Sequence, residues 1–298
     1  MLQTASVIGR EVPLKLLRAV WPTPSSLDVH LLELKRLEFV YEKSLVGDRA
    51  YVFKHALTQE VAHESLLSTV KQVLHEATGS ALESLYADKL EEYYERLAYH
   101  YCQSANKDKA LEYLGLANRK AAKANAMQEA MVYFHQASSV LDSLPDSADN
   151  RRRRVSLIID QWIVFWLLFK IPEYYDLLCG YQRSATELED PGLLAHFQLN
   201  LGHCLWVFGR LEEAVDTFGQ AAKLNEAAGV PAKAGPAYCM LQWTHLWLGN
   251  LEHSLSWQDP ALNGLREVTV DSDTNMRSLV NEEFAQHDSG VQFTATGI

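Results

Sequence analysis

Proline and glycine are scarce in this 298-residue chain, which has nine of the first and fifteen of the second. Because both residues interrupt regular helices, their scarcity argues against a turn-rich β-sandwich and favours long helices. Hydrophobic residues make up 48% of the chain and charged residues 22%, so the chain can bury a core and is not a disordered polypeptide. Its length allows one large domain or two ordinary ones.

Basic charge and long apolar runs are also lacking. The 27 Lys and Arg residues stand against 38 Asp and Glu residues, a formal charge of −11. This balance argues against broad binding to nucleic acid or to anionic membranes. The most apolar run, residues 162–169, is well short of the roughly 20 residues that span a bilayer. We therefore predict a buried helix there, and no signal peptide at the N-terminus.

Cysteine is rare, and no two cysteines form a C-x-x-C pair. Each lies in a stretch with a helical pattern, which predicts buried free thiols in a reducing compartment and a cytoplasmic location. The four residues are Cys102, Cys179, Cys204 and Cys239.

Motifs of catalysis are missing too. The sequence contains no G-x-x-x-x-G-K-[ST], H-E-x-x-H or G-x-S-x-G string and no Gly-rich dinucleotide loop. Among the histidines, His55, His63 and His75 are expected to be surface or hydrogen-bonded residues rather than metal ligands. The sequence thus predicts no catalytic residue, no metal site and no cofactor.

A compact pattern occupies the N-terminal region. Helical periodicity predicts three short helices, the third preceded by Ser25 and Asp28 at capping-box spacing. Three helices followed by a hairpin form a winged-helix pattern, which we assign to a domain over residues 1–75. The predicted helices are 2–8, 13–20 and one ending near Val40; the predicted strands are 39–46 and 50–53, joined through Gly47-Asp48.

Residues 53–67 switch from a strand to a helix. Thr58 is expected to cap this helix, because its hydroxyl can accept a bond from a free backbone N–H. His55 stands at the joint between the two elements.

From about residue 91 the sequence repeats. Seven residues match positions 4, 7, 8, 11, 20, 24 and 27 of the tetratricopeptide signature, in which a bulky-small-aromatic face of the first helix receives small residues of the second. Such units expose an apolar face unless a neighbour covers it, so we predict a right-handed tetratricopeptide-type α-solenoid over residues 76–267, with a soft boundary at 143–150. The seven are Tyr94, Leu97, Ala98, Tyr101, Ala110, Leu114 and Ala117; the same slots from position 7 hold Leu201, Gly202, Leu205, Ala214, Phe218 and Ala221, and the second-helix slots of a further helix hold Ala130, Phe134 and Ala137.

A turn motif recurs every 40 residues: residues 208–214 are echoed by 248–254 and, more weakly, by 168–174. Five tryptophans fall in first-helix slots, where we expect them to fill the core, although one or two could line a concave peptide groove. Residues 151–154, four arginines, are expected to form a solvated face paired with nearby aspartates. The tryptophans are Trp162, Trp166, Trp206, Trp243 and Trp247; the aspartates are Asp142, Asp146 and Asp149.

Two strings carry a resemblance to a known family: residues 2–11, LQTASVIGRE, and residues 53–61, FKHALTQEV. Together they resemble the predicted ATPases of the signal-transduction (STAND) class, those fused to class III adenylate/guanylate cyclase domains, with tetratricopeptide repeats similar to those of MalT-type activators. The resemblance covers about residues 2–267. It implies a nucleotide-binding domain, a winged helix and a helical arm that senses or recruits a partner, and it places His55 where the family sets a histidine against a nucleotide phosphate.

The chain departs from this family because it has no P-loop and no cyclase domain, so we expect it to be a C-terminal part of such a protein. Helical periodicity fades after Arg266, and residues 268–298 are expected to form an atypical, poorly ordered tail. The resulting hypothesis is a non-enzymatic module that docks a protein or peptide in the solenoid groove, next to an upstream nucleotide-binding domain. The alternatives are a regulatory part of an ATPase-coupled cyclase and a winged-helix DNA-binding regulator.

Overall fold

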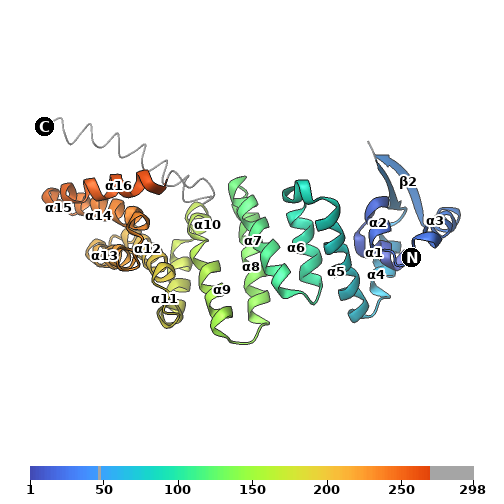
Figure 1. The fold of residues 1–298 in the computed structure, drawn as a ribbon, viewed down its shortest axis with the longest axis horizontal. Coiled ribbons are helices and arrows are strands. Elements are labelled where there is room, and N and C mark those ends of the chain that lie inside the picture. The colour runs from blue at the N-terminus through green and yellow to red at the C-terminus, as the bar shows by residue number, and fades with distance from the viewer. Residues whose placement is uncertain (46–47, 269–298) are drawn as a thin grey trace. The chain divides into compact units, whose positions relative to one another are not determined.

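The chain folds into two mainly helical units, divided between Ser143 and Leu144. The computed structural model describes residues 1–45 and 48–268, and Figure 1 shows helices throughout this part apart from a small sheet near the N-terminus. The mainly α solenoid predicted from the repeat is confirmed. The tail predicted over residues 268–298 lies, apart from Val268, outside the described residues.

The first unit begins with helices and strands in alternation. Strand β3 lies at the centre of a three-stranded antiparallel sheet with the order β1-β3-β2. Its residues Ala50, Tyr51, Val52 and Phe53 are all buried, which explains why this strand lacks the apolar/polar alternation of a one-sided sheet. The elements are α1 (Leu2–Ile8), β1 (Glu11–Pro13), α2 (Leu14–Val20), α3 (Leu27–Arg36), β2 (Val40–Leu45) and β3 (Asp48–Phe53).

Strand β1 was not predicted from the sequence. Pro13, expected to open a helix, instead ends this strand, and α2 begins one residue later. A proline is tolerated there because β1 is an edge strand. The capping box predicted at Ser25 is wrong as well, since α3 begins after Ser26, whose hydroxyl donates to the Thr23 carbonyl instead of capping the helix. The turn predicted at Gly47-Asp48 lies partly outside the described residues.

The helix after the hairpin starts earlier than predicted. Helix α4 (Ala56–Glu64) has His55 at its N-cap in an extended conformation, so Thr58 is already in the first turn and does not cap it. Helix α5 (Ser68–Leu85) then packs on α1 and α2 on one side and on α6 on the other. The expected domain boundary at residues 75 and 76 therefore falls inside one continuous helix.

Helices α6 (Tyr94–Gln103), α7 (Lys107–Lys123) and α8 (Met127–Asp142) continue the first unit as antiparallel neighbours (Figure 1). The carboxylate of Glu83 on α5 ties this stack together, because it accepts hydrogen bonds from the hydroxyls of Tyr101 at 2.9 Å and Tyr113 at 2.5 Å. Lys109 also lies 3.0 Å from this carboxylate. The predicted helix pair over residues 94–117 is confirmed.

The second unit is a run of helical hairpins. Helices α12 and α13 pack closely, since Gly202 lies directly against the ring of Phe218, and both residues fill slots of the repeat signature. The helices are α9 (Ala148–Ile159), α10 (Trp162–Leu167), α11 (Ile171–Glu187), α12 (Pro191–Val207), α13 (Leu211–Ala227), α14 (Gly235–Trp247), α15 (Leu251–Ser256) and α16 (Gln258–Val268).

A break separates α9 from α10, and two buried side chains satisfy the backbone there. The Asn200 amide donates to the Ile159 carbonyl at 2.7 Å and to the Tyr174 hydroxyl at 2.9 Å. The Tyr174 hydroxyl in turn donates to the Ile158 carbonyl at 3.1 Å. Burial raises the pKa of the Tyr174 hydroxyl, so it remains a donor. Carbonyls freed at a helix end are thus paired inside the core.

The tryptophans do not fill the core as expected. Trp166 and Trp247 are exposed, and Trp162, Trp206 and Trp243 are only partly buried. The apolar run at 162–169 is correspondingly half-buried: Val164 and Phe165 face the core, whereas its last residues face outward. Small residues and phenylalanines occupy the tight contacts instead, because a helix pair in close approach has no room for indole rings. In the described part of the chain, each helix is too short or too polar to cross a bilayer.

The arginine run pairs with carboxylates, as predicted. Arg151 contacts Asp146 at 2.8 Å and Arg153 contacts Asp149 at 3.0 Å. Arg152 pairs with Asp190, the N-cap residue of α12, which the sequence did not indicate. These residues therefore form a solvated, internally neutralised face.

Candidate functional site

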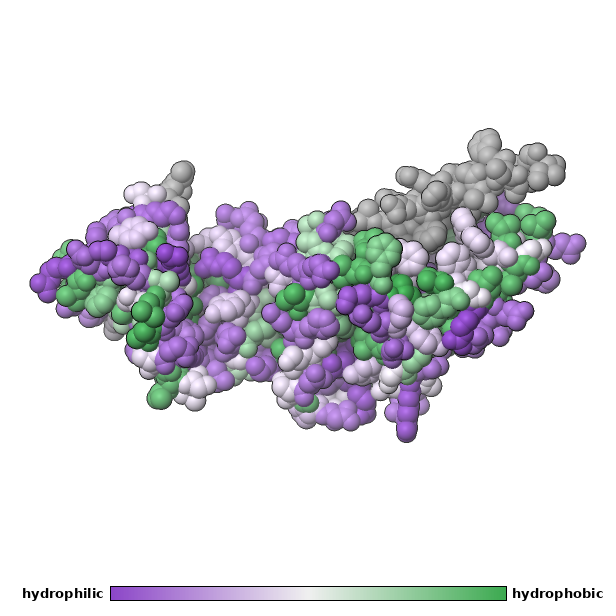
Figure 2. Space-filling model, turned by 180° about the vertical axis from the view of Figure 1, so that it is seen from behind, coloured by the Kyte–Doolittle hydropathy of each residue, from purple (hydrophilic) through white to green (hydrophobic). Residues whose placement is uncertain are grey.

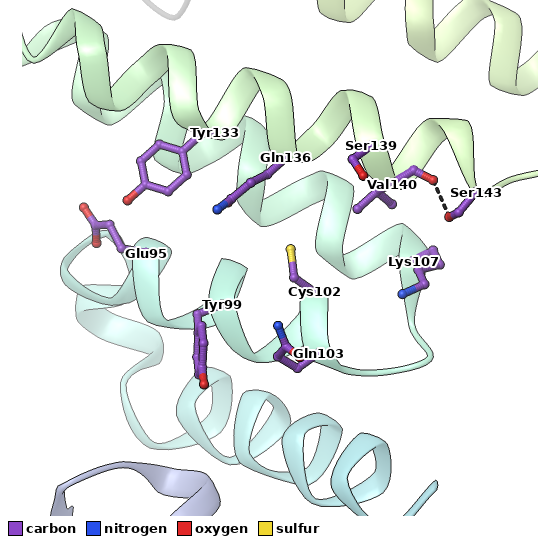
Figure 3. A pocket seen from close by; sticks show the side chains of 10 residues that line it. All are labelled: Glu95, Tyr99, Cys102, Gln103, Lys107, Tyr133, Gln136, Ser139, Val140 and Ser143. Atoms are coloured by element: carbon purple, nitrogen blue, oxygen red, sulfur yellow. Dashed lines mark hydrogen bonds between the residues drawn. The ribbon is translucent and has the colours of Figure 1, made fainter. Parts of the chain in front are cut away.

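A groove of about 540 Å³, lined mostly by residues with polar side-chain groups, lies between α6 and α8 in the first unit. Figure 3 shows that its side chains come from these two helices and from the start of α7, which packs behind them. Helix α7 packs against both α6 and α8. Side chains of α6 and α8 point toward each other on the side of these helices that α7 does not cover, and the groove lies between them. The lining residues are Glu95, Tyr99, Cys102, Gln103, Lys107, Tyr133, Gln136, Ser139, Val140 and Ser143.

Four polar groups in the groove are available to a ligand. The amides of Gln103 and Gln136 and the hydroxyls of Tyr99 and Ser139 have no hydrogen-bond partner within residues 1–45 and 48–268. Each amide can donate and accept at once, and each hydroxyl can do the same. This combination matches the alternating N–H and C=O groups of an extended polypeptide.

The charged groups of the groove are already held in place. The Glu95 carboxylate lies 2.7 Å from the Lys120 ammonium, and Lys107 Nζ donates to the Ser104 carbonyl at 3.2 Å. Burial, together with the neighbouring Glu129, raises the pKa of Tyr133 to about 12, and burial raises that of the Cys102 thiol. Cys102 is therefore a neutral thiol rather than a nucleophilic thiolate.

Two buried histidines lie behind the groove. His75 on α5 and His100 on α6 are 1% and 2% exposed, and their Nδ1 atoms are 3.0 Å apart. One ring must donate and the other accept, so the two rings cannot both be protonated. Tyr99, which lines the groove, packs edge-on against both, with ring centroids 5.6 and 5.2 Å away. The pair therefore supports one wall of the groove.

This pair predicts that the first unit is sensitive to acid. Burial, with positive neighbours, lowers the pKa of His75 from 6.5 to about 4 and that of His100 from 6.5 to about 3. Below pH 6.5 the unfolded chain binds protons that the folded pair excludes, so stability is complete above that pH and falls toward pH 4. We expect a loss of about 1 kcal/mol per histidine between pH 6.5 and 5.5. Hydrogen-exchange protection factors of α5 and α6 would measure it.

A matched control for the acid sensitivity is His135→Gln, at an exposed position on α8. This variant should lose protection with falling pH as the wild type does, whereas His100→Gln should remove about half of the pH dependence. An unchanged protection of α5 between pH 6.5 and 5.5 would contradict the buried neutral pair.

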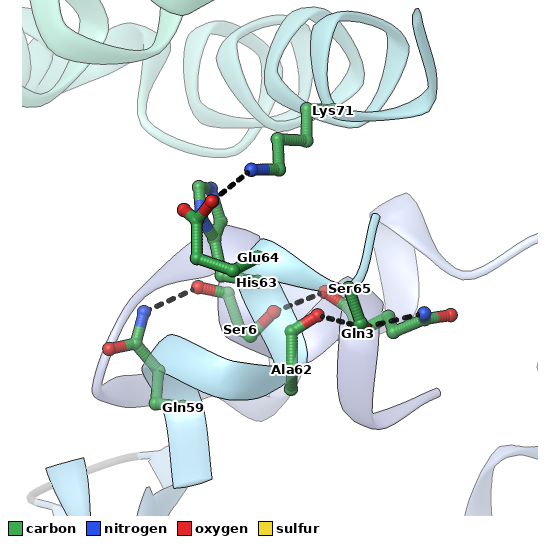
Figure 4. Close-up of polar contacts among 8 residues, drawn as sticks. All are labelled: Gln3, Ser6, Gln59, Ala62, His63, Glu64, Ser65 and Lys71. Carbon is green, nitrogen blue, oxygen red and sulfur yellow. Dashed lines mark hydrogen bonds and ion pairs between the residues drawn. The ribbon is translucent and has the colours of Figure 1, made fainter. Parts of the chain in front are cut away.

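The structure brings the two strings of the family resemblance together (Figure 4). Gln59 Nε2 donates to the Ser6 carbonyl at 2.8 Å, and the Phe53 N–H donates to the Arg10 carbonyl at 3.0 Å. Gln3 Nε2 reaches the Ser65 hydroxyl at 2.9 Å, just beyond the second string. Residues far apart in the sequence thus form one junction between α1 and α4.

His55 lies at this junction but outside the groove. Its side chain is exposed and does not cap α4, while its carbonyl accepts from the Thr58 N–H at 3.1 Å. The other two histidines considered from the sequence differ: His75 is buried and paired, and His63 Nδ1 lies 3.1 Å from Glu64 Oε1. Among the described residues, no group of three or more His, Cys, Asp or Glu side chains is placed to hold a metal ion.

The groove residues were not singled out from the sequence. Their signal was the helical spacing of Tyr99 and Gln103 on one helix and of Gln136, Ser139 and Ser143 on the other. Polar residues at such spacing are ordinary on a solvated face, so spacing alone does not distinguish a groove from a surface. The five tryptophans, one or two of which could have lined a peptide groove, lie in the other unit.

Comparison with known proteins gives a fold but no family. No protein-family model matches the chain, and no curated protein matches its sequence. Aspartyl phosphate phosphatase F from Bacillus subtilis is similar in structure, with 14% identity, a TM-score of 0.53, and 83% of this chain and 62% of that chain covered. BtubC (BKLC) from P. vanneervenii has 12% identity, a TM-score of 0.51, and coverage of 85% and 92%.

A third similar structure is a Rap protein in complex with Competence and Sporulation Factor, with 18% identity, a TM-score of 0.51, and 70% of this chain and 57% of that chain covered. This chain thus spans less than two thirds of the Rap and phosphatase chains. At such identities the likenesses show the fold alone, a mainly α solenoid of the tetratricopeptide type.

Proposed function

We propose that this chain is a non-enzymatic interaction module that binds an extended segment of a partner protein in the groove between α6 and α8. The observation that carries the proposal is the set of four polar groups without partners, on Tyr99, Gln103, Gln136 and Ser139, converging on one open groove. The Rap structure, which shares the fold, is a complex with Competence and Sporulation Factor. The free cysteines are consistent with a cytoplasmic module.

A peptide selection tests this proposal. A random peptide library displayed on phage is selected on the full chain, and the affinities of enriched peptides are measured by fluorescence anisotropy. We expect Gln103→Ala/Gln136→Ala to weaken these peptides at least about tenfold, since two lost hydrogen bonds are worth about 1.4 kcal/mol or more. Both side chains lie at the surface, so the variant keeps the stability of the wild type.

The control is Val132→Ala, at an exposed position of α8 that does not line the groove. It should bind the selected peptides as the wild type does. Enriched peptides that bind the double glutamine variant undiminished would place the binding surface elsewhere and overturn the proposal.

A second candidate is the sensing arm of a signal-transduction ATPase or of an ATPase-coupled cyclase. Its support is the junction between residues 2–11 and 53–61, the two strings that resemble the STAND-class ATPases. In this candidate, residues 1–75 act as a winged helix and His55 senses a nucleotide phosphate. Next to this junction, α4 and the start of α5 expose Leu57, Val61, Leu67 and Val73, a face suited to an upstream domain. Isothermal titration with ATP and ADP should give no heat with this chain alone; micromolar binding would overturn the non-enzymatic proposal.

A DNA-binding function is disfavoured by charge pairing at α3. Lys35 of this helix contacts Glu42 at 2.6 Å, and Arg18 of α2 contacts Asp28 at 3.5 Å. Cations engaged in this way are less available to phosphates. Binding of this chain to duplex DNA that weakens as the salt concentration rises would support the DNA-binding alternative.

A further inference from the structure

Three turns of the second unit share one backbone geometry. In the turn after α10, the Phe169 N–H donates to the Trp166 carbonyl and the Lys170 N–H to the Phe165 carbonyl. The turns after α12 and α14 repeat both bonds at residues 40 and 80 positions later. Such turns need a left-handed residue, and two of them place Gly209 (φ 74°) and Gly249 (φ 76°) there.

The first turn places a phenylalanine at this position. Phe169 has a φ of 57°, a conformation that bulky side chains rarely adopt, and its side chain is 91% exposed. Packing does not explain the residue, because the ring is almost entirely in solvent. A disfavoured backbone at an exposed aromatic residue is an outlier of the kind that occurs at binding sites.

Phe169 belongs to an exposed apolar surface that follows the three turns, here called the turn ridge. Trp247, the last residue of α14, is 64% exposed, and its ring centroid lies 6.0 Å from that of Trp206 near the end of α12. The turn after α12 contacts α11, because the ring centroids of Phe208 and Tyr175 are 5.3 Å apart. Figure 2 shows hydrophobic surface gathered over this unit. The turn ridge consists of Trp166, Leu167, Phe169, Phe208, Trp247 and Leu251.

An acidic rim borders the turn ridge. The first two turns of α11, α13 and α15 and the residues just before them carry six carboxylates and two cations. Both cations are engaged, Lys170 with Glu173 at 3.0 Å and Arg210 with Glu213 at 2.5 Å. The carboxylates of Glu212 and Glu252, at equivalent positions of α13 and α15, are exposed. The rim therefore presents net negative charge beside exposed aromatic rings.

From these observations we propose that the turn ridge docks a basic amphipathic helix of a partner protein. The apolar face of that helix lies on the rings of the turn ridge, and its lysines and arginines meet the carboxylates of the rim. Phe169 is the main anchor, because its side chain is the most exposed of the six. This surface is separate from the groove between α6 and α8 and does not depend on the function proposed for that groove.

The test uses a fluorescein-labelled, 18-residue helical peptide of leucine and lysine with all leucines on one face, and a scrambled peptide of the same composition. We expect the amphipathic peptide to bind the full chain at least tenfold more tightly than the scrambled one. Phe169→Gly should weaken binding at least tenfold while leaving the Tm equal or higher, since glycine suits the left-handed position. Phe169→Asn, which also tolerates this conformation, serves as a second variant. Glu212→Lys/Glu252→Lys should weaken binding and flatten its salt dependence.

Two controls separate this proposal from its alternatives. Val132→Ala, at an exposed apolar position of the first unit that belongs to neither proposed surface, and the groove variant Gln103→Ala/Gln136→Ala should both bind the amphipathic peptide as the wild type does. Equal binding of the two peptides, or undiminished binding by both Phe169 variants, would overturn the proposal. So would dimers of the wild-type chain, seen by light scattering and lost in Phe169→Gly, without peptide binding.

Discussion

Asn200→Leu should lower the free energy of unfolding of the second unit by about 3 kcal/mol. The substitution keeps the branched arrangement of four side-chain heavy atoms but removes the amide that donates to both the Ile159 carbonyl and the Tyr174 hydroxyl. Asn200 is 2% exposed and Tyr174 is fully buried, so water does not replace the lost donor. The Ile159 carbonyl loses this partner, which costs about 1–3 kcal/mol for a buried polar group, and the Tyr174 hydroxyl keeps its bond to the Ile158 carbonyl but loses a second one, worth about 1 kcal/mol.

Urea unfolding followed by tryptophan fluorescence measures this effect, because every tryptophan except Trp21 lies in the second unit. Tyr174→Phe should cost less, about 1 kcal/mol, since the Ile158 carbonyl also accepts from the Gln161 N–H. Gln220→Leu, at an exposed position of α13, is the matched control and should stay within about 0.5 kcal/mol of the wild type. If Asn200→Leu behaves like the control, the amide does not support the break between α9 and α10.

The repeat could be predicted from the sequence because its signal is local and periodic. Small residues at fixed spacing, such as Gly202 and Ala214, indicate from the sequence alone which faces of two helices pack together. Strand β1 could not be predicted in this way: three residues ending in Pro13 carry no strand pattern, and their pairing with β3 joins residues about 40 positions apart. A strand of three residues is too short to show the alternation of apolar and polar residues from which strands are predicted.

The candidate surfaces were harder to predict than the fold. A tryptophan such as Trp247 gives the same sequence signal whether it fills a core or faces solvent, and the rule that large apolar residues are buried assigned it wrongly. The buried pair of His75 and His100 depends on two helices meeting, and no spacing along the chain shows that. Phe169 differs from these residues, because the sequence itself sets it apart: both later copies of the turn have glycine at the equivalent position.

Gly202→Ala should destabilise the second unit by about 2 kcal/mol, although alanine is the better helix former. A Cβ atom at this position would lie 2.6 Å from the ring of Phe218, well inside van der Waals contact. Phe218 is fully buried, so its ring cannot move into solvent, and the two helices must separate. The same urea titration measures the loss.

Gly219→Ala makes the comparison sharp, because no heavy atom lies within 4 Å of its Cβ position. This variant, in the middle of α13, should gain about 0.5–1 kcal/mol from the lower conformational entropy of the unfolded chain. The two glycine variants thus differ in sign for one identical substitution. The double variant Gly202→Ala/Phe218→Leu replaces the ring by a smaller side chain and so makes room for the added Cβ atom. Its loss in the free energy of unfolding should therefore be smaller than the sum of the losses of the two single variants. Stabilisation by Gly202→Ala would mean that α12 and α13 are not in the close contact that defines the hairpin.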